Sequence, residues 1–153
     1  DTRIKPELLL ETLHRLEKTP CVGGGSVIKF EGDVSTLGRA GIALWEYISR
    51  SARIAAGSFI FCRREAFEAV GGYDESLYAS EEVRFSRLIK KWGKSNGLDF
   101  VILNKAPVLT SARKLKWYNG HQILGWITLM MLMPFAVRSR KLCGFWYDRP
   151  KEV

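Results

Sequence analysis

The sequence lacks the cysteine patterns by which disulfides or metal ions hold small domains together. Its three cysteines, Cys21, Cys62 and Cys143, are far apart and form no Cys-x-x-Cys pair, so neither a zinc site nor a disulfide framework is predicted. Free cysteines are typical of a reducing compartment, and we therefore expect a cytoplasmic protein. The chain begins Asp-Thr-Arg without a charged segment and apolar run behind it, so no signal peptide is predicted.

The sequence also lacks low-complexity segments and internal repeats. Its 153 residues are 46% apolar and 26% charged, which is typical of one folded domain with a single core. The net charge of +8 would attract phosphates, anionic lipids or nucleic acid. No helix-turn-helix, RRM or zinc pattern accompanies this charge, so no nucleic-acid partner is predicted.

Hydrophobic spacing and turn residues divide the chain into helices and strands. Leucines recur at helical spacing from Pro6 until Thr19-Pro20 ends the segment. Predicted helices cover 6–18, 33–53, 64–70, 81–92 and a segment from about 117, and predicted strands cover 21–30, 56–62, 100–103 and 108–111. This alternation is typical of the α/β class.

Local details refine this prediction. The apolar side of the helix over 33–53 predicts that this helix is buried; it consists of Leu37, Ile42, Leu44, Trp45 and Ile48. The glycines at 23–25 allow another group to approach the strand backbone closely, and Gly71-Gly72 allows positive φ after a short helix. Ser80 is predicted to cap the helix that begins with Glu81 and Glu82.

The most informative stretch runs from Ala55 to Trp92, AAGSFIFCRREAFEAVGGYDESLYASEEVRFSRLIKKW. It joins a strand, a helix, a glycine turn and two adjacent carboxylates in a fixed order. This order resembles the acceptor-side half of an inverting family 2 glycosyltransferase with the GT-A fold. The resemblance implies a partial GT-A domain over residues 1–112, with a mixed sheet flanked by helices, whose N-terminal nucleotide-binding half is missing.

The resemblance also implies a reaction and its residues. Family 2 enzymes transfer a sugar from a nucleotide-diphosphate sugar to a hydroxyl, and the second acid of their Glu-Asp pair is the general base. Here Glu82 takes that place, with Glu81 beside it, although Glu is one methylene longer than Asp. The alternative is a pair of helix-capping acids balanced by Arg84 and Arg87.

Other parts of the motif imply the substrate-binding residues. Gly57 and Ser58 are implied to lie beside the acceptor, where a small residue leaves room for a sugar ring. Asp74 either lies near the acceptor or is a structural turn acid. Arg63, Arg64 and Phe67 are expected to fix their helix to the fold.

A metal site is implied at the start of the chain. DTRIKPELLLETL resembles the continuation of the family's Asp-x-Asp motif, which would make Asp1 a ligand of Mg²⁺ or Mn²⁺ bridging the donor diphosphate. Farther along, RKLKW resembles the Gln-x-x-Arg-Trp motif of polysaccharide synthases, with Arg113, Lys116 and Trp117 as substrate contacts. A solvated basic stretch is the alternative interpretation of this segment.

Residues 113–153 combine basic clusters with an apolar segment, Ile123 to Val137, which is shorter than the roughly 20 residues that cross a bilayer. Basic flanks and tryptophans are typical of a helix in the membrane interface, while a core helix or a contact with a second copy is the alternative. The protein would then be peripheral on the inner face of the membrane. We expect no sugar transfer by this chain alone. The alternative function is a non-catalytic module that self-associates or binds membrane surfaces.

Overall fold

The computed structural model describes residues 2–55, 57–112, 125, 137–140 and 143. A mixed four-stranded sheet with the order β1-β4-β2-β3 forms its centre. The two long strands β2 and β4 are parallel, and the short strands β1 and β3 pair antiparallel at the edges. The strands are β1 (Thr2–Arg3), β2 (Cys21–Glu31), β3 (Ile60–Cys62) and β4 (Asp99–Ser111).

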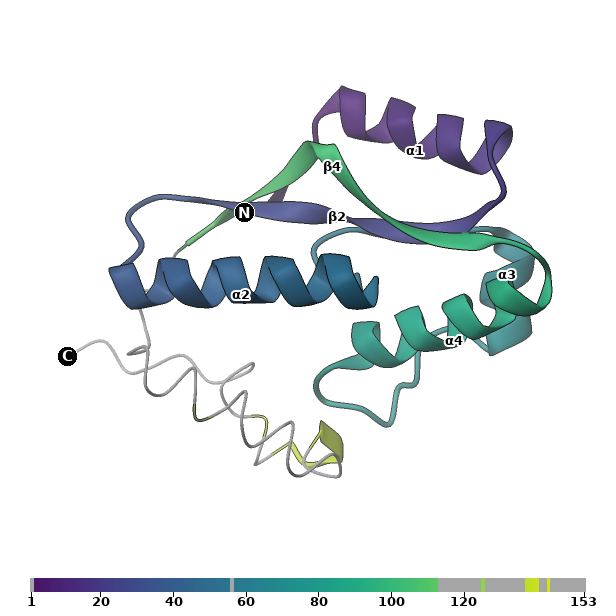
Figure 1. The fold of residues 1–153 in the computed structure, drawn as a ribbon. Coiled ribbons are helices and arrows are strands. Elements are labelled where there is room, and N and C mark those ends of the chain that lie inside the picture. Colours follow the sequence, from purple (N-terminus) through teal and green to yellow (C-terminus); the bar gives the residue numbers. More distant parts are fainter. Residues whose placement is uncertain (1, 56, 113–124, 126–136, 141–142, 144–153) are drawn as a thin grey trace.

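Helices cover both faces of this sheet (Figure 1). α1 lies on one face, and α2 and α4 lie on the other, with α3 beside α4. The helices are α1 (Pro6–Lys18), α2 (Thr36–Ala52), α3 (Arg64–Val70) and α4 (Glu81–Ser95). The predicted α/β class, with a mixed sheet flanked by helices, is therefore confirmed.

Each face of the sheet has its own apolar cluster. α1 packs against one face through Leu8, which is fully buried with Leu103 and Val108 of β4. α3 and α4 pack against the other face, in a cluster that consists of Val22, Ala55, Ala66, Phe85, Ile89 and Phe100. The second cluster holds α4, and thus the predicted acidic pair, against the sheet.

Three of the predicted strands were wrong in their bounds. The strands predicted over 100–103 and 108–111 form one strand, β4, in which residues 104–107 bulge opposite Val27. Pro107 lies in this bulge, where a residue without an N–H group is tolerated. Because proline is not expected within a continuous strand, the sequence predicted two strands instead of one. The strand predicted over 56–62 is reduced to Ile60–Cys62.

The prediction that α2 is a buried helix was wrong. Among its residues only Ser49 is buried, whereas Leu44 is 57% exposed and Leu37 is 49% exposed. The inner side of α2, with Ile42 and Ser49, faces β2 across a small void. Apolar periodicity identified the stripe on this helix, but periodicity cannot tell which neighbour covers it.

The turn predictions at the two ends of the acidic segment had different outcomes. α3 ends at Val70, and the C-cap residue Gly71 (φ 78°) and the following Gly72 (φ 72°) both have positive φ as predicted. Ser80 occupies the N-cap position of α4, but its own φ is 61° and its side chain makes no capping hydrogen bond. The prediction that Ser80 caps α4 was therefore wrong, because the left-handed backbone is not the extended conformation from which a serine normally caps.

Candidate active site

Two of the predicted site residues, Glu82 and Gly57, face each other. A Cβ atom placed on Gly57 would lie 3.7 Å from Cδ of Glu82 and 3.8 Å from its Oε1. Gly57 is exposed, while Glu82 is partly buried in the first turn of α4. The structure therefore places an open position without a side chain in front of a carboxylate.

A ladder of contacts between α4 and the segment after α2 fixes this arrangement. The Lys90 ammonium donates to the carbonyl of Ala52 (2.5 Å), and one turn earlier the Ser86 hydroxyl accepts from the backbone N–H of Ala55 (3.1 Å). One further turn earlier, Glu82 faces Gly57. Residues 82, 86 and 90 share one side of α4 because they are spaced by four. Their contacts hold the backbone that carries Gly57 against the helix that carries Glu82.

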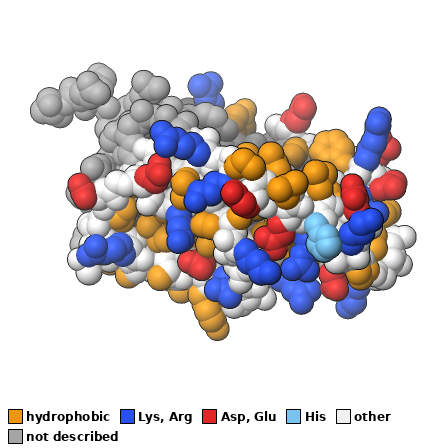
Figure 2. Space-filling view, turned by 90° about the horizontal axis from the view of Figure 1, so that it is seen from above, with side chains coloured by type: hydrophobic (Ala, Val, Ile, Leu, Met, Phe, Trp, Pro, Cys, Tyr) orange, Lys and Arg blue, Asp and Glu red, His pale blue; other side chains and the backbone are white. Residues whose placement is uncertain are grey.

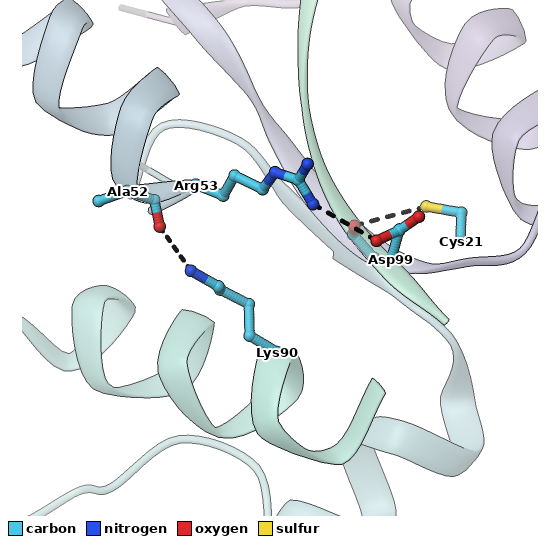
Figure 3. A network of polar contacts seen from close by, with 6 residues as sticks. Cys21, Ala52, Arg53, Lys90 and Asp99 are labelled. Carbon is cyan, nitrogen blue, oxygen red and sulfur yellow. Dashed lines mark hydrogen bonds and ion pairs between the residues drawn. The ribbon is translucent and has the colours of Figure 1, made fainter. Parts of the chain in front are cut away.

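The chain reverses direction between α2 and this segment at Arg53. Its backbone is left-handed (φ 49°, ψ 58°), and its guanidinium pairs with Oδ1 of Asp99 at the start of β4 (3.4 Å). Figure 3 shows this ion pair beside the bond from Lys90 to Ala52, on either side of the end of α2. The end of α2 is thus attached to both β4 and α4.

Gly25 of β2 allows the segment to lie close to the sheet. A Cβ atom on Gly25 would lie 2.6 Å from Cβ of Ala55, which is closer than real Cβ contacts allow. Ala55 is fully buried at this position. The prediction that glycines of this strand allow another group to approach closely is confirmed, and the group is the segment that leads to Gly57.

Burial raises the pKa of the Glu82 carboxyl. A hydrogen bond from its own backbone N–H opposes this effect, and the neighbouring Glu81 charge adds to it. A carboxylate with a raised pKa is a stronger base than an exposed glutamate. The electrostatics of Glu82 are those expected of a residue that accepts a proton.

Tyr73 follows the glycine turn of the motif, and its contact with Phe85 was not predicted from the sequence. Its ring stacks on Phe85 at 4.3 Å between centroids with an interplanar angle of 21°, and it is 42% exposed. Burial raises the pKa of the Tyr73 hydroxyl, and the charges of Glu82 and Glu81 add to this effect. Phe85 follows Glu82 by one turn of α4 and therefore lies near the same side of the helix. This spacing was the signal in the sequence that an aromatic group lies beside the acid.

Asp74 organises a turn. Its Oδ1 accepts from the backbone N–H (3.1 Å) and hydroxyl (2.5 Å) of Ser76, and its Oδ2 pairs with Nε of Arg84 (3.0 Å). These hydrogen bonds with Ser76, and the Arg84 charge, lower the pKa of Asp74. The geometry favours the interpretation of Asp74 as a structural turn acid that also ties its loop to α4.

The cations of α3 have different roles. Arg63 donates from Nε to the carbonyl of Cys21 and from Nη2 to that of Leu16, both at 2.7 Å, which fixes the start of α3 as expected. Arg64 instead pairs with Glu68 of its own helix, exposed to solvent. Phe67 packs edge-on against Phe85 at 5.8 Å.

Several predicted site residues lie outside the described residues: Asp1, Arg113, Lys116 and Trp117. Ser58 is described and partly buried next to Gly57. Across residues 2–55, 57–112 and the short pieces near the C-terminus, no group of three His, Cys, Asp or Glu side chains could hold a metal ion.

Comparison with protein-family models, with curated proteins and with solved structures found no match to this chain. A search of the described helices for one long and apolar enough to cross a membrane found none.

The raised pKa of Glu82 predicts how its ionisation affects stability. The folded protein binds this proton more tightly than the unfolded chain, so the stabilisation is present below the ordinary glutamate pKa of about 4.3 and is lost as pH rises through the raised pKa. Glu82→Gln cannot ionise. We expect the variant to match the parent near pH 4 and to be more stable near pH 7, as measured by urea unfolding. A stability difference that does not change with pH would contradict the assignment.

Proposed function

We propose that this chain supplies the acceptor-side part of an inverting glycosyltransferase with the GT-A fold. The single observation that carries the proposal is the carboxyl of Glu82, with its pKa raised, facing the open position at Gly57. The order of elements around it, from the strand after Gly57 through α3 and the Gly71-Gly72 turn to the acidic start of α4, supports the same family. Sugar transfer requires these residues together with a site that binds the donor.

The proposed reaction is a single displacement. The acceptor hydroxyl lies at Gly57, and Glu82 takes its proton while the oxygen attacks the anomeric carbon of the donor. The bond between this carbon and the nucleotide diphosphate breaks, and the diphosphate leaves with the electron pair. Attack from the face opposite to the leaving group inverts the configuration.

Binding of the donor diphosphate is assigned to residues near the ends of the described region. Asp1 would hold Mg²⁺ or Mn²⁺, which when bound stabilises negative charge on the leaving diphosphate. Arg113, Lys116 and Trp117 would contact the substrates.

A second candidate function is the non-catalytic module that self-associates or binds a membrane. The exposed apolar side chains of α2 favour it. A monomeric protein rarely leaves a large contiguous patch of such side chains exposed, and such patches mark surfaces that bind a partner or a membrane. The raised pKa of a carboxyl in front of an open glycine has no role in such a module. The two functions are therefore distinguished by sugar transfer itself.

Enlarging residue 57 tests where the acceptor binds. Gly57 is not among the glycines with positive φ, so its backbone accepts other residues. A Cβ fits at 3.7 Å from Glu82, but a leucine would occupy the space in front of the carboxyl. We expect Gly57→Leu to lower transfer by about a hundredfold and Gly57→Ala to lower it less, in assays of the full-length protein with nucleotide-diphosphate sugars and Mn²⁺. Transfer by Gly57→Leu at the parent rate would exclude acceptor binding at this position.

A further inference from the structure

α2 has an apolar outer side that no described element covers. Leu37, Leu44 and Ile48 recur at a spacing that returns to one side of a helix, and they are 49%, 57% and 38% exposed. Tyr47 lies next to them and is 70% exposed. The inner side, which contains Ile42 and Ser49, faces β2 instead. Within the part of the chain that the structure describes, no element therefore covers the outer stripe.

α4 has a basic outer side on the same face of the sheet. Arg87, Lys91 and Lys94 are exposed, recur at helical spacing, and form no ion pair with another residue of the described part of the chain. Positive charge also gathers where α4 meets the end of α2. Burial lowers the pKa of the Lys90 ammonium, and the nearby positive charges of Arg53 and Arg87 lower it further.

The basic stripe of α4 and the apolar stripe of α2 lie on one side of the sheet. Figure 1 shows α2 and α4 on the same side of the sheet and α1 on the other. Figure 2, the view from above, shows acidic and basic side chains mixed among hydrophobic ones. On α4, by contrast, the acids are confined to the first turn, and the rest of the helix carries only basic charge. Among the described residues, the apolar stripe of α2 and the basic stripe of α4, which forms no ion pair, thus lie on the same side of the sheet.

We propose that the face formed by α2 and α4 docks on an anionic lipid bilayer. Leucine, isoleucine and tyrosine side chains of α2 would enter the boundary between headgroups and acyl chains, while the long basic side chains of α4 reach lipid phosphates. A nucleic acid would use the basic stripe but not the apolar one. A purely apolar partner would leave the basic stripe unused.

Docking on a bilayer would place the site next to lipid molecules and so favour a lipid as the acceptor. This inference about the acceptor rests on the proposed function. α2 leads directly into the segment that carries Gly57, and α4 begins with the acidic pair that includes Glu82. The C-terminal end of α2 and the N-terminal end of α4 therefore both lie close to the site residues along the chain. The acceptor we infer is the hydroxyl of a lipid, presented from the bilayer to Glu82.

Vesicle flotation tests the docking without any assay of activity. The full-length protein is mixed with vesicles of phosphatidylcholine alone or with about one third phosphatidylglycerol. We expect binding to the anionic vesicles, lowered about a hundredfold by the triple change Arg87→Gln, Lys91→Gln and Lys94→Gln, since each basic residue near an anionic surface contributes about fivefold. Leu44→Ser with Ile48→Ser should lower binding by about tenfold. All of these positions are exposed, and circular dichroism melts verify folding.

Matched controls lie on the α1 side. Leu10→Ser with Leu13→Ser removes two apolar side chains that are at least as exposed as Leu44 and Ile48 on average, and the triple change Lys5→Gln, Lys18→Gln and Lys105→Gln removes the same charge. Controls that keep vesicle binding support the proposal, whereas controls that lose it equally overturn it. So would binding to DNA that is insensitive to Leu44→Ser, or a stable dimer that Leu44→Ser dissociates. If flotation succeeds and only water-soluble acceptors are used, the docking stands and the lipid acceptor is wrong; absence of any sugar transfer contradicts the proposed function instead.

Discussion

Glu82→Gln is expected to lower sugar transfer by the full-length protein by about a hundredfold to ten-thousandfold, the range typical of the loss of a general base. Glutamine has nearly the same volume as glutamate and keeps the contact with Gly57, but it cannot accept the proton of the attacking hydroxyl. Turnover with saturating donor and acceptor measures the effect. Because the change removes an interaction needed only in the transition state, kcat should fall while donor affinity stays close to that of the parent.

Glu81→Gln is the matched control for this change. It removes the same charge from the neighbouring residue of the first turn, but the side chain next to Gly57 is that of Glu82. We expect the control to lower turnover much less. Normal turnover by Glu82→Gln would transfer the role of base to Glu81 or Asp74. An equal loss of donor affinity would indicate that Glu82 acts through a metal ion rather than on the acceptor.

Local sequence patterns predicted most helices but not the contacts that build the site. Pro6 and the leucines after it defined α1, and the Gly71-Gly72 turn defined the end of α3, because these signals act within a few residues. The ladder that joins Lys90 to Ala52 and Ser86 to Ala55 links segments far apart in the chain. A single sequence contains no local signal for such pairs.

The pairing of Glu82 with Gly57 shows what the family resemblance contributed beyond such patterns. Both residues were singled out from the motif, and in the structure a Cβ atom on residue 57 would lie 3.7 Å from Cδ of Glu82. Tyr73 belongs to the same motif, but its stacking on Phe85 was not predicted, because it depends on where the loop before α4 folds back. The exposure of Leu44 was also unpredictable, because amphipathic helices look alike in sequence whether the protein or another partner covers them.

Phe85→Ala is expected to lower the free energy of unfolding by about 3–5 kcal/mol, the cost of removing a buried phenylalanine and leaving a cavity. Phe85 is 2% exposed and packs in the cluster that joins α3 and α4 to the sheet. Urea unfolding of parent and variant measures the loss.

Phe67→Ala is the matched control, because it removes the same side chain from the same aromatic group where it is 41% exposed. Its cost should be well below that of Phe85→Ala, since less apolar surface returns to water. Equal costs would mean that the two rings are equally important for the core. Phe85 also supports the ring of Tyr73 one turn from Glu82, so its loss should weaken the site in any protein that remains folded. A folded Phe85→Ala protein with the parent's acceptor KM would show that the aromatic group holds the core together but does not shape the acceptor site.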